Sequence, residues 1–182
     1  VLIVAIIVVI DSPGASPIYV SKRIGKNGKK FNFYKIRTMV PNADKLLDEI
    51  LHQNEMDGPV FKIKDDPRIT RIGRFLRKTS IDELPQLWNV LKGDMSLVGP
   101  RPERPLFVEK FKEEIPRYMV KHQVRPGLTG WAQINGRNAI SSWEERFAFD
   151  LEYVENNLIC LLNFAFVKVL QNMDFHLLLL HH

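Results

Sequence analysis

Cysteine is almost absent from this 182-residue chain, which contains only Cys160. A single cysteine cannot form an internal disulfide framework, and it leaves no cysteine cluster that could hold zinc. Cys160 lies in an apolar run, so we expect a buried, unreactive thiol rather than a nucleophile.

Several common catalytic signatures are also missing. The chain has no G-x-x-x-x-G-K-[ST] phosphate loop and no nucleophile-elbow serine. Its histidines form no metal-ligand constellation, since His52 and His122 are isolated in the sequence. We interpret both histidines as structural residues.

The charge balance leans to the positive side, with 26 Lys and Arg against 21 Asp and Glu and a formal net charge of +5. Hydrophobic residues make up 45% of the chain and charged residues 26%, which is typical of one folded domain. A basic domain favours anionic partners such as nucleic acid, phosphorylated metabolites or anionic lipid. Composition does not choose among them.

Long hydrophobic runs are scarce, and the N-terminal run of residues 1–10 has only ten apolar residues. Ten helical residues rise about 15 Å, roughly half of a hydrocarbon core of about 30 Å. The run is therefore too short to span a bilayer. It fits the second half of a longer segment, an interfacial or re-entrant piece, or a buried β-strand.

Two alternating segments, residues 18–24 and 30–39, flank the sequence Gly25-Lys-Asn-Gly28. Asn-Gly between alternating segments predicts a β-hairpin. From Val20 to Met39 there are seven Lys or Arg and no Asp or Glu, so the hairpin is strongly basic. A Pro- and Ser-rich linker, residues 11–17, precedes it.

An RNA-binding alternative arises from the same loop, because KH domains clamp RNA with a G-x-x-G loop. In KH domains that loop joins two helices, whereas here it joins two predicted strands. Phe31, Phe33 and Tyr34 would suit base stacking, but their alternation favours packing in the core.

Helical periodicity recurs along the rest of the chain. Residues 70–78 predict a basic amphipathic helix, with Ile72, Phe75 and Leu76 on its apolar face. Ser80-Ile-Asp-Glu83 fits a capping box. Further helices are expected at 41–56, 106–114 and 117–122. Another is expected after Glu83, with Leu84, Leu87, Trp88 and Leu91 on one face. A second capping box at 142–145 precedes a helix with Phe147, Leu151 and Val154 facing the core.

The adjacent acids Asp82 and Glu83 are the first candidates for chemistry. Taken alone, they fit helix capping: Glu83 would reach back to Ser80, and Asp82 would complement the helix dipole. The same location would keep a carboxylate ionised and would attract phosphate. A carboxylate beside a phosphate can attack phosphorus, provided that cations screen the repulsion between the two anions.

Arginines that could supply this screening surround the acids in the sequence. Arg77 lies five residues before Asp82, and Arg101 lies between two prolines that restrict its backbone. Arg125 and Arg137 lie in Gly- and Pro-rich loops, and loops of this kind often carry function. We expect a phosphate-binding cleft.

Several blocks of this sequence closely resemble the bacterial sugar transferase family, the monotopic polyprenol-phosphate phosphoglycosyl transferases of capsule, exopolysaccharide and glycan assembly. Residues 66–102 carry the resemblance, including Asp82-Glu-Leu-Pro-Gln86 and Gly99-Pro-Arg-Pro102. It extends over residues 22–39, with Tyr34-Lys-Ile-Arg37, and over 124–138.

The resemblance implies an activity and assigns roles. The substrates would be a UDP-sugar and a polyprenyl (undecaprenyl) phosphate, and transfer of sugar 1-phosphate would release UMP. Asp82 matches the nucleophile that forms a phosphosugar–enzyme intermediate, and Glu83 matches its acidic partner, associated with Mg²⁺. Lys35, Arg77 and Arg101 match basic residues around the family's active site.

We therefore expect an α+β fold: a mostly helical domain with a basic β-hairpin and an N-terminal membrane-associated helix. It would act at the cytoplasmic face of the bacterial cytoplasmic membrane, in contact with lipid and without nucleic acid; a homo-oligomer stays open. Residues 1–10 would be the remnant of a re-entrant membrane helix, 11–157 the catalytic domain, and 158–182 an apolar C-terminal segment that includes tag-like residues.

Two alternatives to this enzyme are kept. One is an RNA- or polyanion-binding module. The other is a truncated, inactive domain at the membrane surface that retains only its affinity for phosphate.

Overall fold

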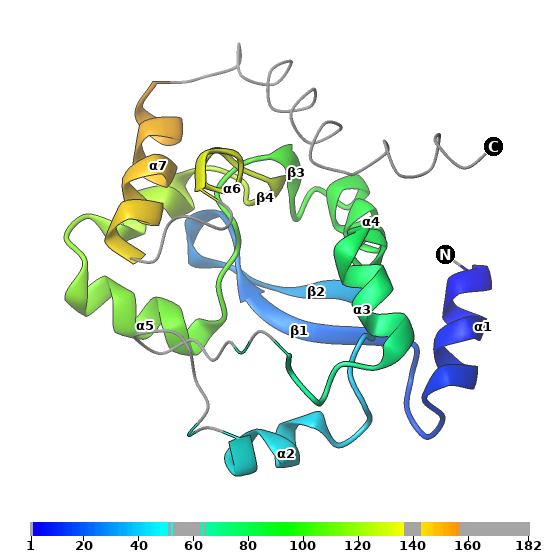
Figure 1. The fold of residues 1–182 in the computed structure, drawn as a ribbon. Helices are drawn as coiled ribbons and strands as arrows, with labels where there is room; N and C mark the ends of the chain where they lie inside the picture. The colour runs from blue at the N-terminus through cyan, green and yellow to red at the C-terminus, as the bar shows by residue number, and fades with distance from the viewer. Residues whose placement is uncertain (1, 51, 53–62, 64, 137–142, 157–182) are drawn as a thin grey trace. The chain divides into compact units, whose positions relative to one another are not determined.

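The computed structural model describes residues 2–50, 52, 63, 65–136 and 143–156 (Figure 1). The predictions for Cys160, for Arg137 and for the segment 158–182 concern residues outside these ranges. The contacts divide the chain into two compact units, each described by itself below. The first unit comprises Val1–Val20 and Tyr34–Pro85, and the second comprises Ser21–Phe33 and Gln86–His182.

The described part has the mixed α+β fold that the sequence predicts, mostly helical and with a β-hairpin. The helices are α1 (Leu2–Asp11), α2 (Ala43–Ile50), α3 (Arg71–Lys78), α4 (Gln86–Leu91), α5 (Pro105–Glu114), α6 (Trp131–Gly136) and α7 (Trp143–Glu155). The 3-10 turns and strands are η1 (Lys26–Gly28), η3 (Ile81–Glu83), η4 (Tyr118–Gln123), β1 (Ile18–Ile24), β2 (Lys30–Ile36), β3 (Ser96–Val98) and β4 (Gly127–Thr129).

The predicted hairpin is present as the two-stranded sheet β1–β2. Its turn places Asn27 at φ 55° and Gly28 at φ 73°, the left-handed conformation that Asn and Gly adopt at least cost. Within the second unit, Phe31 and Phe33 are buried in a cluster with Met95. The aromatic alternation therefore serves the core, as predicted, and leaves these two rings covered rather than open to bases.

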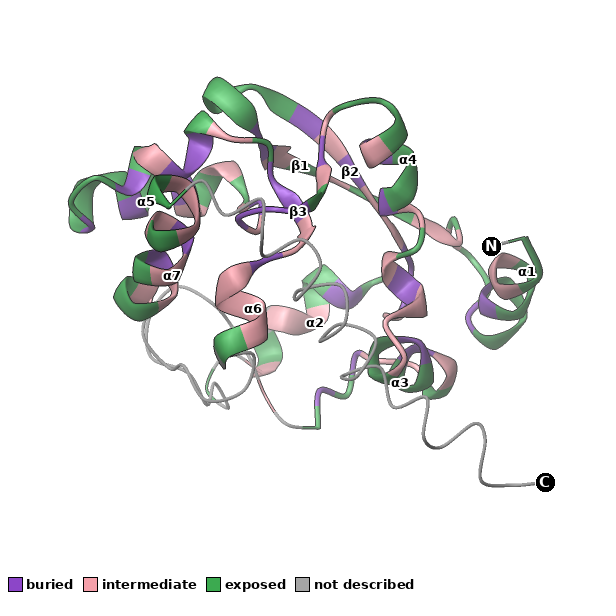
Figure 2. Cartoon of the chain, turned by 90° about the horizontal axis from the view of Figure 1, so that it is seen from above, coloured by how far each residue is buried: buried purple, intermediate pink, exposed green. Residues whose placement is uncertain are grey.

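The N-terminal run forms helix α1, so the β-strand alternative is wrong. Val8 of α1 is buried with Ile36 and Leu76 in the core of the first unit, and α1 lies beside α3 (Figure 1). The rest of its surface is largely exposed (Figure 2). Among the helices in the described ranges, none combines the length and the apolar composition needed to cross a bilayer.

Buried Arg37 fixes the linker that follows α1. Its guanidinium donates to Ser12 Oγ at 3.1 Å and to three backbone oxygens, those of Ser12 at 2.5 Å, Ala15 at 3.0 Å and Ser16 at 2.8 Å. These carbonyls follow the end of a helix, where backbone oxygens lack helical partners. The Arg37 side chain supplies those partners and holds the linker against the unit.

Helix α3 begins where the sequence predicts. The hydroxyl of its N-cap residue, Thr70, accepts a hydrogen bond from Gly73 N at 2.9 Å, which satisfies one of the free N–H groups of the first turn. A Cβ atom on Gly73 would lie 2.1 Å from the Thr38 carbonyl oxygen. Glycine at this position therefore lets α3 approach the chain that follows β2.

In the second unit, β3 and β4 pair in parallel, with Ser96 opposite Gly127 and Val98 opposite Thr129. The sequence predicted a loop around Gly127 and no strand at either segment. The two backbones approach so closely that a Cβ atom on Gly127 would lie 2.1 Å from Gly99 N. The pairing joins the Pro-flanked loop after β3 to the Gly-rich loop around β4.

The core of the second unit gathers around Phe111, Tyr118 and Phe147, and Phe147 faces this core as predicted. A buried ion pair lies in the same unit, with Lys121 Nζ 2.7 Å from Asp150 Oδ2. Burial raises the pKa of the Asp150 carboxyl, while the Lys121 ammonium opposes that shift. The pair links η4 to α7.

Two helix predictions change in the structure. Helix α2 covers Ala43–Ile50, and most of the remaining predicted segment lies outside the described ranges. Leu84, Leu87, Trp88 and Leu91 are all exposed, whereas Gln86 and Asn89 are fully buried. The reason is a polar anchor: Asn89 Nδ2 donates to Asn32 O at 2.7 Å, which turns the polar face of α4 inward.

Candidate functional site

The candidate site is built on η3, which carries both Asp82 and Glu83. Ser80 precedes it in the left-handed conformation, at φ 57° and ψ 16°, and its side chain makes no capping hydrogen bond. The predicted capping box is therefore wrong, and the next α-helix, α4, starts only at Gln86. The backbone N–H of Ser80 donates to Arg77 O at 3.3 Å, and the Glu83 carboxylate is engaged by a distant residue.

That engagement is with Lys35 of β2. Lys35 Nζ donates to Glu83 Oε1 at 2.7 Å and lies 3.6 Å from Asp82 Oδ2. The sequence separation between Lys35 and Glu83 is 48 residues. One ammonium thus contacts both acids and holds η3 against β2.

Asp82 is the buried member of the acidic pair, with 5% of its surface exposed. Burial raises the pKa of its carboxyl above the ordinary value; Lys35 opposes this, the Glu83 charge adds to it, and Arg77 again lowers it. We expected the start of a helix to favour the ionised form of Asp82, but η3 is only a three-residue 3-10 turn. The cations Lys35 and Arg77, rather than the three-residue turn, favour the charge.

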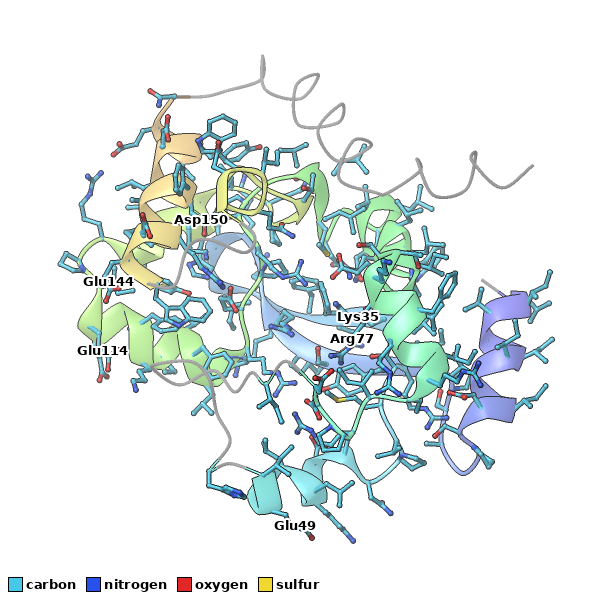
Figure 3. All side chains as sticks on the ribbon, in the orientation of Figure 1. Lys35, Glu49, Arg77, Glu114, Glu144 and Asp150 are labelled. Carbon is cyan, nitrogen blue, oxygen red and sulfur yellow. The ribbon has the colours of Figure 1, made fainter. Side chains whose placement is uncertain are left out.

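Arg77 lies on α3 in the same unit, and Figure 3 labels it close to Lys35. Its Nε donates to Thr38 Oγ1 at 2.8 Å. Burial lowers the pKa of the guanidinium, while the charges of Asp82 and Asp66 raise it. Arg77 therefore lies in the field of two carboxylates and is held by a hydroxyl.

A second ion pair borders this cluster. The Asp66 carboxylate accepts from Arg68 N, Nε and Nη2 at 3.0, 2.9 and 2.6 Å. Both residues are buried. The hydrogen bond from Arg68 lowers the pKa of Asp66 against the opposing effect of burial. Asp66 therefore stays ionised near Arg77.

The structure brings together four of the seven predicted site residues, Lys35, Arg77, Asp82 and Glu83, all in the first unit. Arg101 and Arg125 belong to the second unit. Arg137 lies outside the described ranges.

Within the second unit, Arg101 is half-buried and lines a small pocket together with Gly25, Lys121 and His122. Arg125 is exposed. Gly127 N donates to Pro100 O at 3.0 Å, so the β3–β4 pairing holds the two arginine-bearing loops together.

Two residues near the site were not predicted from the sequence as site residues. Thr38 and Arg37 follow β2 directly, and the resemblance over residues 22–39 covered both without giving either a role. A buried threonine beside a basic strand carries no local signal of its own. Only the fold reveals that its hydroxyl meets an arginine 39 residues away.

The donor set at η3 suits magnesium. In the described part of the chain, no group of three or more His, Cys, Asp or Glu side chains is arranged to hold a metal. Mg²⁺ does not need such a cage, because it commonly binds one or two carboxylates together with substrate phosphates and water. Asp82 and Glu83 supply two carboxylates beside two cations, an arrangement that fits a phosphate substrate and its metal.

Comparison with known proteins shows the family of the whole chain. A family model described as "Bacterial sugar transferase" matches residues 1–172. The chain belongs to the bacterial sugar transferase family.

Three relatives make the similarity concrete. The chain is 46% identical over 159 residues to the UDP-galactose-lipid carrier transferase of Erwinia amylovora, covering 85% of this chain and 32% of that protein. It is 46% identical over 147 residues to the undecaprenyl-phosphate galactose phosphotransferase of Salmonella typhimurium, covering 79% and 30%. It is 42% identical over 156 residues to the UDP-glucose:undecaprenyl-phosphate glucose-1-phosphate transferase of Escherichia coli (strain K12), covering 83% and 31%. The chain thus spans about a third of the length of these relatives.

Proposed function

We propose that this chain transfers a sugar 1-phosphate from a UDP-sugar to a polyprenyl phosphate, releasing UMP, at the cytoplasmic face of the bacterial membrane. The observation that carries the proposal is the buried carboxylate of Asp82, held beside Glu83 under Lys35 and Arg77. The names of the relatives, which speak of UDP-sugars and undecaprenyl phosphate, supply the substrate classes.

The first chemical step is attack by Asp82. One carboxylate oxygen forms a bond to the phosphorus that carries the sugar, and the bond from that phosphorus to the oxygen bridging to UMP breaks. UMP leaves with the bridging oxygen and its electron pair. Asp82 then carries the sugar phosphate as an acyl phosphate.

The second step returns the enzyme to its starting state. A phosphate oxygen of the polyprenyl phosphate attacks the same phosphorus, and the bond to the Asp82 oxygen breaks. The product is a polyprenyl diphosphosugar, and Asp82 is again a carboxylate. Asp82 is the nucleophile of the first displacement and the leaving group of the second, so both substrates react at the same carboxylate.

The neighbours of Asp82 make an anion-on-anion attack feasible. Lys35 and Arg77 lower the pKa of a carboxyl that burial raises, which keeps the reactive form populated. Both cations also attract the diphosphate, and preorganised positive charge stabilises the charge that develops on the phosphoryl oxygens. Arg101, Arg125 and Arg137 are proposed as phosphate-binding residues from the sequence alone, since Arg101 and Arg125 belong to the second unit and Arg137 lies outside the described ranges.

Glu83 would hold Mg²⁺ together with the substrate phosphates. A carboxylate can accept several contacts, so the bond from Lys35 Nζ to Oε1 is compatible with this role. When bound, the metal would neutralise charge on the diphosphate and on departing UMP.

Helix α1 is the part of the chain that we assign to the membrane. Leu2, Ile3 and Ile10 of α1 are at least 74% exposed, and its inner face packs on the first unit through Val8. An isolated exposed apolar residue is ordinary, but a whole apolar helix face is typical of a surface that contacts lipid or protein. Contact with lipid would bring the polyprenyl substrate close to the chain.

The decisive experiment substitutes Asp82→Asn and measures UMP release from a panel of UDP-sugars. The side chain keeps its shape and loses its nucleophilic charge, so we expect the rate to fall by roughly 10³ or more. Intact-mass spectrometry of the unsubstituted chain with the matching UDP-sugar should detect one added sugar phosphate, and the Asp82→Asn variant should show none.

Asp65→Asn is the matched control, because Asp65 is an exposed carboxylate on the same unit. It should retain both UMP release and the mass adduct. Unchanged UMP release by Asp82→Asn would sink the proposal. Saturable RNA affinity without UMP release would instead favour a polyanion-binding module.

A further inference from the structure

The hydroxyl of Thr38 is a hydrogen-bond partner of the Arg77 side chain. Arg77 Nε donates to Thr38 Oγ1 at 2.8 Å, and Thr38 is buried. An arginine has five N–H donors in a planar fork. Binding one of them at Nε leaves the two terminal nitrogens to act on carboxylate or phosphate and fixes the plane of the group.

Thr38 itself is held from two directions. Its carbonyl oxygen accepts from Thr70 N at 3.1 Å, and the neighbouring residues Met39 and Ile69 form an isolated β-bridge. Glycine at position 73 permits this approach, because a Cβ there would lie 2.1 Å from the same carbonyl. A β-branched side chain also has few χ1 rotamers. The hydroxyl is therefore a fixed point beside α3.

The charges around Arg77 make its orientation consequential. Asp82 and Asp66 both act on the guanidinium, and Asp66 accepts from Arg68 on both of its oxygens. An arginine between two carboxylates could turn toward either one. A neutral acceptor at Nε selects one orientation of the guanidinium without neutralising its positive charge.

We propose that Thr38 is a positioning residue, which orients the Arg77 guanidinium so that its terminal nitrogens serve Asp82 and the substrate diphosphate. The inference rests on the proposed function for the role of Arg77, and the hydrogen bond itself does not depend on that function. Thr38 does not touch the reacting atoms. It acts through Arg77.

Three variants test this role by enzyme kinetics. Thr38→Val keeps the shape and removes the acceptor, and we expect kcat/KM for UMP release to fall roughly tenfold or more, the effect of losing a hydrogen bond to a charged group. Thr38→Ser keeps the hydroxyl and should retain most of the activity. In the Arg77→Ala background, adding Thr38→Val should cost almost nothing further, because the partner is already absent.

A spectroscopic readout tests the same contact without any substrate. The ¹⁵N signal of the Arg77 Nε–H group, identified by its loss in Arg77→Lys, should exchange slowly with water in the unsubstituted chain and in Thr38→Ser. It should exchange faster in Thr38→Val. Should Thr38→Val fail to fold, Thr38→Ala removes the same acceptor and takes its place in both measurements.

The outcomes separate the two proposals. Equal impairment of Thr38→Ser and Thr38→Val, independent effects of Thr38→Val and Arg77→Ala, or an unchanged Arg77 Nε–H signal in Thr38→Val would each overturn the positioning role. If the unsubstituted chain released no UMP from any UDP-sugar, the proposed function would fail, and the Nε–H signal would still decide whether Thr38 orients Arg77.

Discussion

Burial and positive charge act in opposite directions on the carboxyl of Asp82. Removal from water disfavours the charged form and raises the pKa, and the ammonium of Lys35 opposes that effect most strongly. A carboxylate that has lost part of its hydration has less water to displace before it attacks. The Asp82 carboxylate can therefore be both poorly hydrated and ionised, but only while the cations stay in place.

Replacing Lys35 by Met tests this balance. Without the ammonium, the pKa of Asp82 rises further above its ordinary value, so protonation removes the nucleophile at a higher pH. We expect the acid limb of the pH dependence of kcat/KM to move to higher pH. We also expect the maximal rate to fall about 10²-fold or more, since a cation is lost from the site.

Two substitutions calibrate that result. Lys35→Arg retains the charge and should leave the acid limb closer to its original position than Lys35→Met does. Lys30→Met removes an exposed lysine from the same strand and should leave the whole profile unchanged. An acid limb that stays in place in Lys35→Met would contradict the role of Lys35 in keeping Asp82 ionised.

At the residue scale, the sequence predicted the members of the acidic pair better than their surroundings. Asp82, Glu83, Lys35 and Arg77 were named as candidates, and the structure brings them together. The expected capping by the Ser80 side chain was wrong, and the Glu83 carboxylate accepts from a lysine 48 residues away. Local rules cannot anticipate a competitor that only the tertiary fold supplies.

At the element scale, local sequence signals predicted the turns and helix starts that neighbouring residues determine. The Asn-Gly turn marked the β1–β2 hairpin, and Thr70 marked the start of α3. The β3–β4 pairing was missed because its partners lie about 30 residues apart and each strand has only three residues. The exposed apolar face of α4 was also unforeseen, since the periodicity of a helix does not say which face is covered.

Helix α1 carries a prediction at this scale, the binding of vesicles. Replacing Ile3, Ile6 and Ile10 by Ser removes exposed apolar surface from α1 without touching the buried Val8. Full burial of one Ile side chain is worth about 1.5–3 kcal/mol, so partial burial of three should make partition into anionic liposomes weaker by about 100-fold or more. Co-flotation with the liposomes measures the partition.

The matched control lies in the other unit. Leu106 of α5 is 75% exposed, and Leu106→Ser should leave the partition unchanged if α1 is the membrane contact. Equal flotation of the triple variant and the unsubstituted chain would exclude that role for α1. A fall of the same size in both variants would indicate nonspecific adsorption of exposed apolar groups.

At the scale of the whole molecule, each unit buries a pair of opposite charges. The first unit buries charges in pairs that include Asp66 with Arg68. The second buries the pair Lys121 and Asp150 and places a histidine directly beside the lysine. Truncating one partner of a buried pair is expected to cost about 3–5 kcal/mol, so the stability of each unit depends on these contacts.

His122 makes the stability of the second unit depend on pH. The histidine is 5% exposed, and burial, reinforced by the Lys121 ammonium, lowers its pKa to about 4 against a slight opposing effect of the Met119 backbone. Its ring meets the Tyr118 ring edge-on at 5.7 Å, and Arg101 lines the same pocket. Two of these neighbours, Lys121 and Arg101, are cations, so they disfavour a further positive charge on His122.

The direction of the effect follows from proton binding. Between about pH 6.5 and 4 the unfolded chain binds a proton at His122 that the folded chain does not bind, so the free energy of unfolding should fall as the pH falls through this window, by up to about 1.4 kcal/mol per pH unit. Tryptophan fluorescence in urea reports this unit, because Trp88, Trp131 and Trp143 all belong to it. His122→Asn should show a shallower pH dependence than the unsubstituted chain, whereas His52→Asn, at an exposed position, should not. Equal slopes for His122→Asn and the unsubstituted chain would mean that His122 does not titrate differently in the folded and unfolded states.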